Sequence, residues 1–353
     1  MSEIRQDVTT KEWVIVAPER GKRPHEHPEI KQAALDELPA YEPTCPFCPG
    51  NEAETPGEVL RIPAPAEQPD WSVRVVPNRF AALTPDADTT RTEEGPFFRK
   101  MGGYGVHEVI IDSPSHNTPL ALMDYLQVEN ILTAYQQRYN AIKKNREIRH
   151  ITIFKNCGQE AGTSLVHPHS QLVATPIMAT YYHRKFDVAH DYYADRGRCL
   201  YCDLIAWELG RGDARVVADT KEFIVVHPYA SHAPYETWIL PKMHCASFGL
   251  FPERHLAELS RVLKDVIFCL YQGLDNPAYN LAIDSTTTYD EDDPYYHWHI
   301  RIIPRLSTIA GFEMGSGIYI STSLPEDTAG HMRQVAASCP DNVCAIFNNG
   351  PHG

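Results

Sequence analysis

A β-like segment near the middle of the chain carries two histidines and a glutamine at alternate positions. It reads SLVHPHSQLVATP over residues 164–176, with His167, His169 and Gln171 two residues apart. Because side chains alternate between the two faces of a strand, we expect these three on one face. A neutral histidine whose Nδ1–H is held by a carbonyl keeps its lone pair on Nε2, which can attack phosphorus. The segment predicts His169 as a nucleophile that carries a phosphorus-containing group.

Gln171 and the loop before the strand narrow the type of reaction. A glutamine amide can hold a phosphoryl oxygen but cannot protonate a leaving group, which favours group transfer over hydrolysis. The glycine-bearing run NCGQEAGTS precedes the strand, and backbone N–H groups of such loops can bind phosphate. The alternative is a pair of buried histidines with a purely structural role.

Two CxxC motifs, CPFC and CLYC, predict metal sites. Two thiolates and two neutral imidazoles form the ligand set of a closed, structural zinc site. In the order of the chain, the first set is Cys45, Cys48, His116 and His167, and the second is Cys199, Cys202, His244 and His297. The first site would fix His167 and thereby position His169. Free thiols are the alternative at the first site, and His232 or His299 are competing ligands at the second.

The elements around these residues occur twice, in the same order. Each CxxC is followed by a β-like segment, then by HEVIIDSPSH or YETWILPKMH, then by a long amphipathic stretch, a short strand and a His-x-His strand. Two sets of residues recur at helical spacing: Val128, Ile131, Leu132, Tyr135, Tyr139 and Ile142, and Leu256, Leu259, Leu263, Val266 and Leu270. The repeated order predicts a duplicated α+β fold.

The repeat sets the expected domain organisation. We predict an N-terminal domain over residues 1–190, with the nucleophile and one zinc site, and a C-terminal repeat over 191–353 with a second zinc site. The second motif, HWHIRIIP, places Arg301 where Gln171 stands, and no glycine-rich loop precedes it. His299 is therefore predicted to be a vestigial counterpart of His169. Residues 84–103 and the acidic run at 289–294 are predicted to be exposed loops.

Composition excludes several classes of protein. The 353 residues carry a net charge of −14, which argues against nucleic acid or an anionic membrane as partner, because both require a basic face. There is no apolar run of membrane-spanning length and no signal-peptide core, so we expect a cytoplasmic protein. Nine cysteines are then more typical of thiols and metal ligands than of disulfides. Those outside the CxxC motifs have no partner spacing and are expected to be core or surface thiols: Cys157, Cys245, Cys269, Cys339 and Cys344.

These motifs resemble the galactose-1-phosphate uridylyltransferases, a branch of the histidine-triad superfamily, over nearly the whole chain. The resemblance implies a duplicated histidine-triad-like fold in which helices pack on an antiparallel half-barrel sheet. It also implies a homodimer and a ping-pong reaction in which His169 takes a uridylyl group from a UDP-sugar and a sugar 1-phosphate then accepts it. The family's zinc ligands correspond to the first set above. The iron site of its well-studied members, which uses a histidine where Arg301 stands, is not expected here.

The same resemblance assigns binding residues. APERGKRP, VVPNRFAAL, IFKNCGQEAGTSLVHPHSQ and GFEMGSG match the family's substrate-contacting segments. By position they implicate Arg20, Arg23, Asn78, Arg79, Asn156, Gly162, Ser164, Phe312 and Glu313, with Gln171 assisting His169. The last two would reach the active site of the neighbouring subunit.

Two other functions remain open at this point. An ADP-glucose or dinucleoside polyphosphate phosphorylase would use the same histidine with an adenine nucleotide, and a CxxC in the second half is a feature of the plant ADP-glucose phosphorylases. A non-catalytic zinc protein that binds nucleotides would need neither Gln171 nor an unhindered His169.

Overall fold

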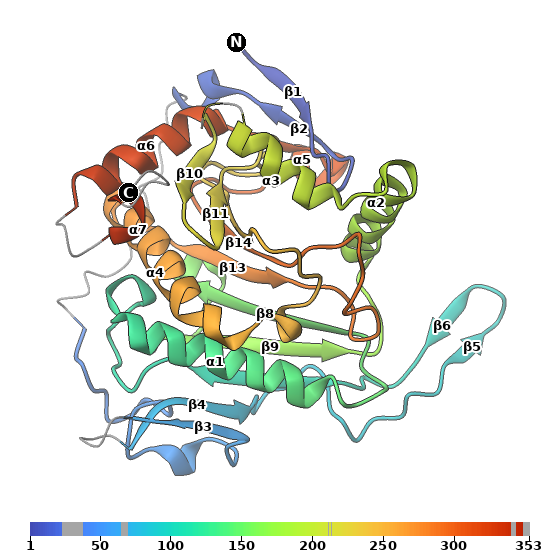
Figure 1. Cartoon of the computed structure of the whole chain (residues 1–353). Coiled ribbons are helices and arrows are strands. Elements are labelled where there is room, and N and C mark those ends of the chain that lie inside the picture. Colours follow the sequence, from blue (N-terminus) through green and yellow to red (C-terminus); the bar gives the residue numbers. More distant parts are fainter. Residues whose placement is uncertain (23–37, 65–69, 211, 213, 340–343, 349–353) are drawn as a thin grey trace.

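One large antiparallel sheet organises the molecule (Figure 1). The computed structural model describes residues 1–22, 38–64, 70–210, 212, 214–339 and 344–348. The ten strands, in spatial order, are β10 (Val216–Asp219), β11 (Phe223–Val226), β12 (Thr237–Pro241), β14 (His299–Pro304), β13 (Tyr279–Asp284), β8 (His150–Cys157), β9 (His169–Thr175), β7 (Val106–Ile111), β4 (Trp71–Pro77) and β3 (Leu60–Pro63). The predicted α+β class is confirmed.

The strand order contains the predicted repeat. Each half arranges its strands as first, second, third, fifth and fourth in chain order, and the two fourth strands, β8 and β13, pair at the centre of the sheet. In this pair Asn156 lies opposite Asn280. Each fifth strand, β9 or β14, begins at the second histidine of its motif. The two histidines therefore occupy corresponding positions on either side of the central pair.

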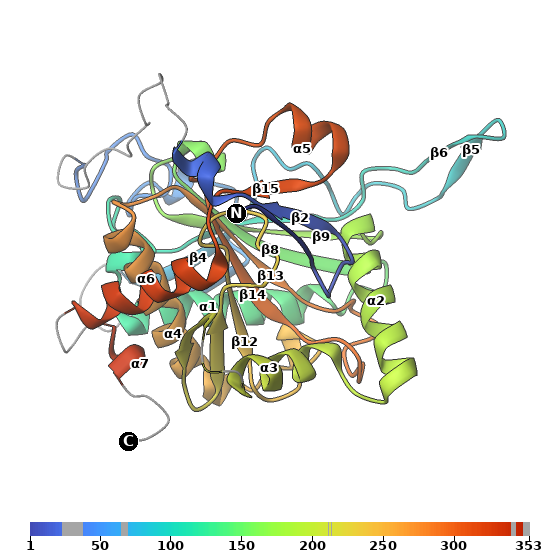
Figure 2. The ribbon, with the colours of Figure 1, turned by 90° about the horizontal axis from the view of Figure 1, so that it is seen from above.

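The two predicted amphipathic helices are α1 (Tyr125–Ile142) and α4 (Leu256–Gly273). Every residue named above for their apolar faces is buried. The helices pack against each other and belong to one hydrophobic core with the sheet. Figure 2 shows them on one side of the sheet, with α5 and β15 on the other. The Asp124 carboxylate begins α1 by accepting a 2.7 Å hydrogen bond from the Gln127 amide.

Besides α1 and α4, the described residues form further helices. They are α2 (Thr180–Arg196), α3 (Leu200–Gly210), α5 (Gly311–Ser316), α6 (Pro325–Ala337) and α7 (Ala345–Asn348), with short 3₁₀ turns at η1 (Pro18–Lys22), η3 (Glu52–Glu54), η4 (Leu120–Leu122), η5 (Gln159–Ala161), η6 (Phe248–Leu250) and η7 (Glu253–His255). The predicted boundary at residues 190/191 falls within α2. None of the helices in the described ranges combines the length and apolar composition of a membrane span.

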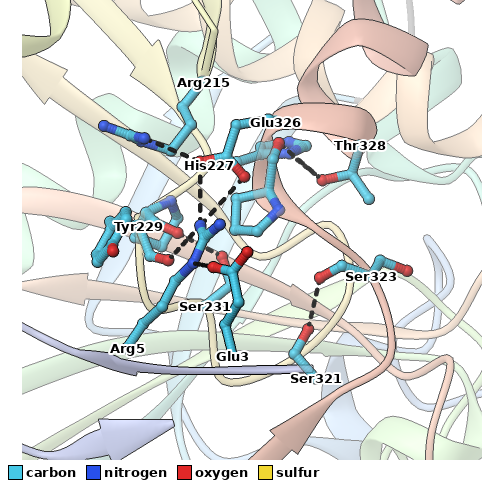
Figure 3. Close-up of polar contacts among 12 residues, drawn as sticks. Glu3, Arg5, Arg215, His227, Tyr229, Ser231, Ser321, Ser323, Glu326 and Thr328 are labelled. Carbon is cyan, nitrogen blue, oxygen red and sulfur yellow. Dashed lines mark hydrogen bonds and ion pairs between the residues drawn. The ribbon is translucent and has the colours of Figure 1, made fainter. Parts of the chain in front are cut away.

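A second, three-stranded sheet joins the N-terminus to the C-terminal half. It consists of β1 (Glu3–Gln6), β2 (Trp13–Val16) and β15 (Tyr319–Ser321). Figure 3 shows Arg5 of β1 at the centre of its polar contacts: the guanidinium lies 2.9 Å from Glu3 and 3.0 Å from Glu326, at the start of α6. Arg215 also contacts Glu326, at 2.9 Å. The ion pair between buried Arg5 and Glu326 attaches β1 to the C-terminal repeat.

The segment at 84–103 is exposed, as predicted, but is not only a loop. It contains a short hairpin formed by β5 (Thr92–Glu94) and β6 (Phe98–Lys100), which projects from the body of the molecule (Figures 1 and 2). Phe97 and Phe98 at its turn are largely exposed. The alternation of polar and apolar residues there was too weak to predict strands. The acidic segment 289–294 contains no helix or strand, as predicted.

Candidate active site

His169 begins β9, and one nitrogen of its ring is fixed. Nδ1 lies 2.9 Å from the carbonyl oxygen of His167. Because a carbonyl can only accept, Nδ1–H is the donor, and the lone pair of the neutral ring is on Nε2. Burial lowers the pKa of His169 below its ordinary value, so the ring is neutral near pH 7. This is the protonation state that a nucleophile toward phosphorus requires.

The expectation that His167, His169 and Gln171 share one strand face is wrong for the first residue. The strand starts at His169, and Pro168, which lacks an N–H, immediately precedes it. Outside the regular strand, the His167 ring turns to the cysteines of the CPFC motif. Its position before the strand lets the two histidines serve different sites.

A cavity of 480 Å³ lies beside His169. This volume is within the range of small-ligand sites. Its walls come from the end of β8, from η5 and from residues 163–169. Three residues that sequence analysis assigned to binding or catalysis line it: Asn156, Ser164 and His169. Asn156 is itself held by Asn280 of β13, whose Nδ2 donates to its Oδ1 at 2.7 Å.

A buried ion pair lies under His169. The Lys155 ammonium is 2.7 Å from the Asp112 carboxylate and donates a 3.0 Å hydrogen bond to the His169 carbonyl oxygen. The Ser170 hydroxyl donates to Asp112 at 2.8 Å and accepts from Tyr135 at 2.5 Å. This network holds the backbone of His169 in place through its carbonyl oxygen and through Ser170. Sequence analysis missed Lys155 and Asp112, although a lone lysine within the apolar strand HITIFKN was a usable signal.

Gln171 is oriented by His107, a second residue that sequence analysis missed. His107 Nδ1 accepts a hydrogen bond from the Ala82 amide at 3.2 Å, which places the ring proton on Nε2. Nε2 lies 2.8 Å from Gln171 Oε1, so it donates to that oxygen. The amide oxygen of Gln171 is thereby occupied, and its NH₂ group is the end that can donate to a ligand.

The glycine-bearing loop is tighter than expected. Gly158 and Gly162 both have positive φ angles, +88° and +89°, which favours glycine at each position. The amides of Ala161, Gly162 and Thr163 donate to carbonyls within the loop. These three N–H groups are therefore committed to the turn, and a phosphate held by this loop would have to use other backbone N–H groups.

The other predicted binding residues lie apart from this cavity. Asn78 accepts a hydrogen bond from the Phe80 amide at 2.9 Å and contacts His107, whereas Arg79 is exposed. Arg20 is exposed on η1, and Arg23 lies outside the described residues. Phe312 and Glu313 are on α5, where Glu313 accepts from the Ala310 amide. Asn78 is linked to Gln171 through His107, whose Nε2 contacts both side chains.

The four predicted ligands of the first metal site come together. Cys45, Cys48, His116 and His167 are all buried, and their ligand atoms lie within 4.8 Å of one another. His167 Nδ1 is 3.7 Å from Cys45 Sγ and 3.6 Å from Cys48 Sγ. Its Nε2–H donates to the Ser113 carbonyl at 2.8 Å, which leaves the Nδ1 lone pair toward the sulfurs. An orienting carbonyl of this kind is typical of metal-binding histidines.

The second set converges in the same way. The ligand atoms of Cys199, Cys202, His244 and His297 lie within 4.8 Å of one another. His297 Nε2 donates to the Pro241 carbonyl at 2.8 Å, and Nδ1 lies 3.7 Å from Cys202 Sγ. Both clusters can therefore hold a metal ion.

His299 repeats the backbone contact of His169 but not its free nitrogen. His299 Nδ1 lies 3.1 Å from the His297 carbonyl. Its Nε2 lies 3.1 Å from the Lys185 ammonium, which also pairs with Asp284 at 2.6 Å. Because the ammonium can only donate, it occupies the Nε2 lone pair. His299 is 0% exposed, against 8% for His169, so the second histidine is closed to a substrate.

The sequence of the chain matches two family models and several known nucleotidyltransferases. The family model described as the N-terminal domain of galactose-1-phosphate uridyl transferase matches residues 1–179. A model for a domain of unknown function matches 123–341. An ADP-glucose phosphorylase from Arabidopsis thaliana is 34% identical, with 95% of this chain and 93% of the relative covered. A galactose-1-phosphate uridylyltransferase from Thermotoga maritima is 27% identical, with coverages of 95% and 98%.

Solved structures of similar enzymes superpose on this chain over nearly its whole length. The crystal structure of the Arabidopsis thaliana ADP-glucose phosphorylase with bound ADP-glucose superposes with a TM-score of 0.81 at 32% identity, and 95% of this chain and 98% of the other are covered. A structure described as a uridylyltransferase superposes with a TM-score of 0.71 at 25% identity, with coverages of 95% and 98%. The likeness spans both repeats in each case.

Proposed function

Since the chain belongs to the galactose-1-phosphate uridylyltransferase family of nucleotidyltransferases, we propose that it transfers a uridylyl group from UDP-glucose to galactose 1-phosphate through His169. One observation carries this proposal: the neutral His169 ring lines a cavity, with Nδ1–H held by a carbonyl and the lone pair on Nε2.

In the first half-reaction, His169 Nε2 attacks the α-phosphorus of UDP-glucose. An Nε2–P bond forms, and the bond between the α-phosphorus and the bridging oxygen breaks, so glucose 1-phosphate leaves with that oxygen. The ring becomes cationic because Nδ1 keeps its proton. The His167 carbonyl, 2.9 Å from Nδ1, would stabilise that charge, and the Gln171 NH₂ group would hold a nonbridging phosphoryl oxygen.

In the second half-reaction, a phosphate oxygen of galactose 1-phosphate attacks the same phosphorus. The Nε2–P bond breaks, the electron pair returns to Nε2, and UDP-galactose is released. Neither step requires a proton at the leaving group, because a phosphate leaves or returns as an anion. Positioning and charge stabilisation therefore carry the reaction, which suits glutamine at position 171.

A second candidate function is the phosphorolysis of ADP-glucose. The observation that favours it is the 34% identity to a protein named ADP-glucose phosphorylase, together with the TM-score of 0.81 to its complex with ADP-glucose. His169 would carry an adenylyl group in place of a uridylyl group, and inorganic phosphate would be the acceptor. The chemistry at phosphorus is the same for both candidates.

A matrix of donors and acceptors tests the two. The purified protein is incubated with UDP-glucose or ADP-glucose, each with galactose 1-phosphate or inorganic phosphate, and the released sugar phosphate and new nucleotide are quantified. We expect the highest kcat/KM for UDP-glucose with galactose 1-phosphate. A preference for ADP-glucose with phosphate would establish the second candidate, and turnover with no pair would contradict both.

We propose zinc as the metal of both Cys₂His₂ clusters, with a structural role. Two thiolates balance the dication, and the two neutral imidazoles complete a tetrahedron without an open position. In the first cluster the ion would fix His167, whose carbonyl holds His169. Metal analysis of the protein, purified without added metal, should give zinc at both clusters.

We further propose a cytoplasmic homodimer in which α5 brings Phe312 and Glu313 to the neighbouring active site. Both residues lie on a helix that is exposed in the single chain, which supports a role outside their own subunit. Sedimentation equilibrium should give twice the chain mass, and Phe312→Ala should raise KM. A monomeric protein with full activity would contradict this assembly.

A further inference from the structure

Three cysteines that share no sequence motif converge near the C-terminal end of the described chain. Cys269 is on α4, Cys339 follows α6, and Cys344 immediately precedes α7. Cys269 Sγ is 3.4 Å from Cys344 Sγ, which is 3.0 Å from Cys339 Sγ. All three sulfurs lie within 4.8 Å of one another. Each was expected to be a core or surface thiol, and their spacing in the sequence does not indicate this cluster.

The cluster lies in the interior and depends on an unusual backbone conformation. Cys269 and Cys344 are fully buried and Cys339 is partly buried. Cys344 has a φ of +62°, a left-handed conformation that costs free energy in a residue with a β-carbon. This turn brings its sulfur to the other two.

Neighbouring polar groups are already engaged with the protein. The carboxylate of Asp265 accepts hydrogen bonds from the Tyr125 hydroxyl at 2.9 Å and from the Ile346 amide at 3.4 Å. It holds the start of α7 rather than a ligand. The three sulfurs are thus the group in this region that is suited to a soft metal ion.

We propose that Cys269, Cys339 and Cys344 form a third metal site, which binds zinc through three thiolates. Thiolate ligands select zinc and other soft ions over magnesium or calcium. The thiols release their protons to solvent when the metal binds, and a small exogenous ligand such as water takes the fourth position. The ion would connect the end of α6 and the start of α7 to α4. The proposal is independent of the nucleotidyl-transfer function, because these residues do not line the cavity at His169.

The first test compares two single cysteine variants with the wild type. Cys339→Ser removes the partly buried ligand with the smallest disturbance of packing, and Cys157→Ser, a partly buried cysteine outside all three clusters, is the control. Zinc per chain is measured on folded protein by native mass spectrometry. We expect Cys339→Ser to lose one zinc ion per chain and Cys157→Ser to lose none. Equal zinc content in all three proteins would overturn the proposal.

A second readout uses the wild-type protein alone. Metal-loaded protein is treated with a thiol-alkylating reagent before and after chelation, and the peptide with Cys339 is analysed by mass. We expect protection of Cys339 before chelation and alkylation afterwards. Alkylation of the metal-loaded protein, or a mass that indicates a Cys339–Cys344 disulfide, would overturn the metal site.

Discussion

His169 and His299 occupy corresponding positions in the two repeats, yet their surroundings differ at one nitrogen. Both start the fifth strand of their half, both hold Nδ1–H against the carbonyl two residues earlier, and both follow a cluster of two cysteines and two histidines. A buried lysine–aspartate pair lies beside each. In the N-terminal half the lysine contacts a backbone carbonyl, whereas in the C-terminal half it contacts the imidazole itself.

This difference shows that two similar scaffolds can leave Nε2 of one histidine available and occupy Nε2 of the other. Lys155 is on β8 and contacts the backbone carbonyl of His169, so Nε2 of His169 stays available. Lys185 is on α2, which follows the first repeat, and its ammonium fills the space over His299. In the C-terminal half, His299 thus lies in a buried group with Lys185 and Asp284. The predictions below test this division, from the largest expected effect to the smallest.

Replacing the two histidines should give opposite results. We expect His169→Ala to lower kcat by about 10⁴-fold or more, because removal of a covalent nucleophile leaves only binding and charge stabilisation. His299→Gln should leave kcat of the folded protein within a few-fold of wild type. Steady-state kinetics on variants with matched circular dichroism and zinc content decide this. Comparable losses in both variants would mean that the C-terminal half also does chemistry.

Replacement of Lys185 should lower stability alone, whereas replacement of Lys155 should lower both stability and activity. Lys185→Met removes the nearest charge partner of buried Asp284, whose carboxylate keeps Arg301 at 3.9 Å and the Tyr182 hydroxyl at 3.2 Å. It should cost up to about 3–5 kcal/mol of unfolding free energy, with little change in kcat of the folded fraction. Lys155→Met should cost a similar amount and also lower kcat, because it releases the backbone of His169. Urea unfolding and kinetics are measured together.

The double variant Lys185→Met/Asp284→Leu is the control, since removal of both charges should recover part of the lost stability. If Lys185→Met instead allowed His299 to accept a nucleotidyl group from a donor, Lys185 would be blocking a histidine that is still reactive.

Loss of the first CxxC motif should affect activity more than loss of the second. Cys45→Ser and Cys199→Ser should each lose one zinc ion per chain. Cys45→Ser should also lower kcat/KM by about 10- to 100-fold, because His167 is then less well fixed. Cys199→Ser should mainly lower the melting temperature. An equal effect of both on kcat/KM would contradict the assignment of a purely structural role to the second cluster.

Buried neutral histidines in both halves predict an acid-dependent loss of stability. Burial lowers the pKa of His227 to about 3 and that of His150 to about 4. Below about pH 6.5 the unfolded chain binds protons that these folded-state rings do not, so the free energy of unfolding decreases as pH falls. His227, which contacts Thr328 (Figure 3), should contribute up to about 1.4 kcal/mol per pH unit.

Urea unfolding of wild type and His227→Gln at about pH 7 and about pH 5 measures this contribution. The variant should lose less stability on acidification than wild type. An unchanged pH dependence would show that His227 is protonated in the folded protein.

Much of the arrangement could be predicted because the informative residues are patterned. The α1 and α4 faces follow from apolar spacing, and the Cys₂His₂ clusters follow from CxxC motifs and repeated order. The contacts of Lys185 could not be predicted, because α2 lies between the repeats and its position depends on tertiary packing. The same applies to the His107–Gln171 hydrogen bond and to the three-cysteine cluster. His107 and Cys269 are far in sequence from the residues they meet, and neither belongs to a motif that links it to them.

The most direct measurement is capture of the covalent intermediate. Wild-type protein is mixed with UDP-glucose without an acceptor and quenched in base, where a phosphoramidate survives, and the adduct is located by peptide mass spectrometry. We predict a uridylyl group on His169, formed in equal amount with released glucose 1-phosphate and discharged by galactose 1-phosphate. An adduct on His299, or turnover of the donor with no adduct on His169, would contradict the account.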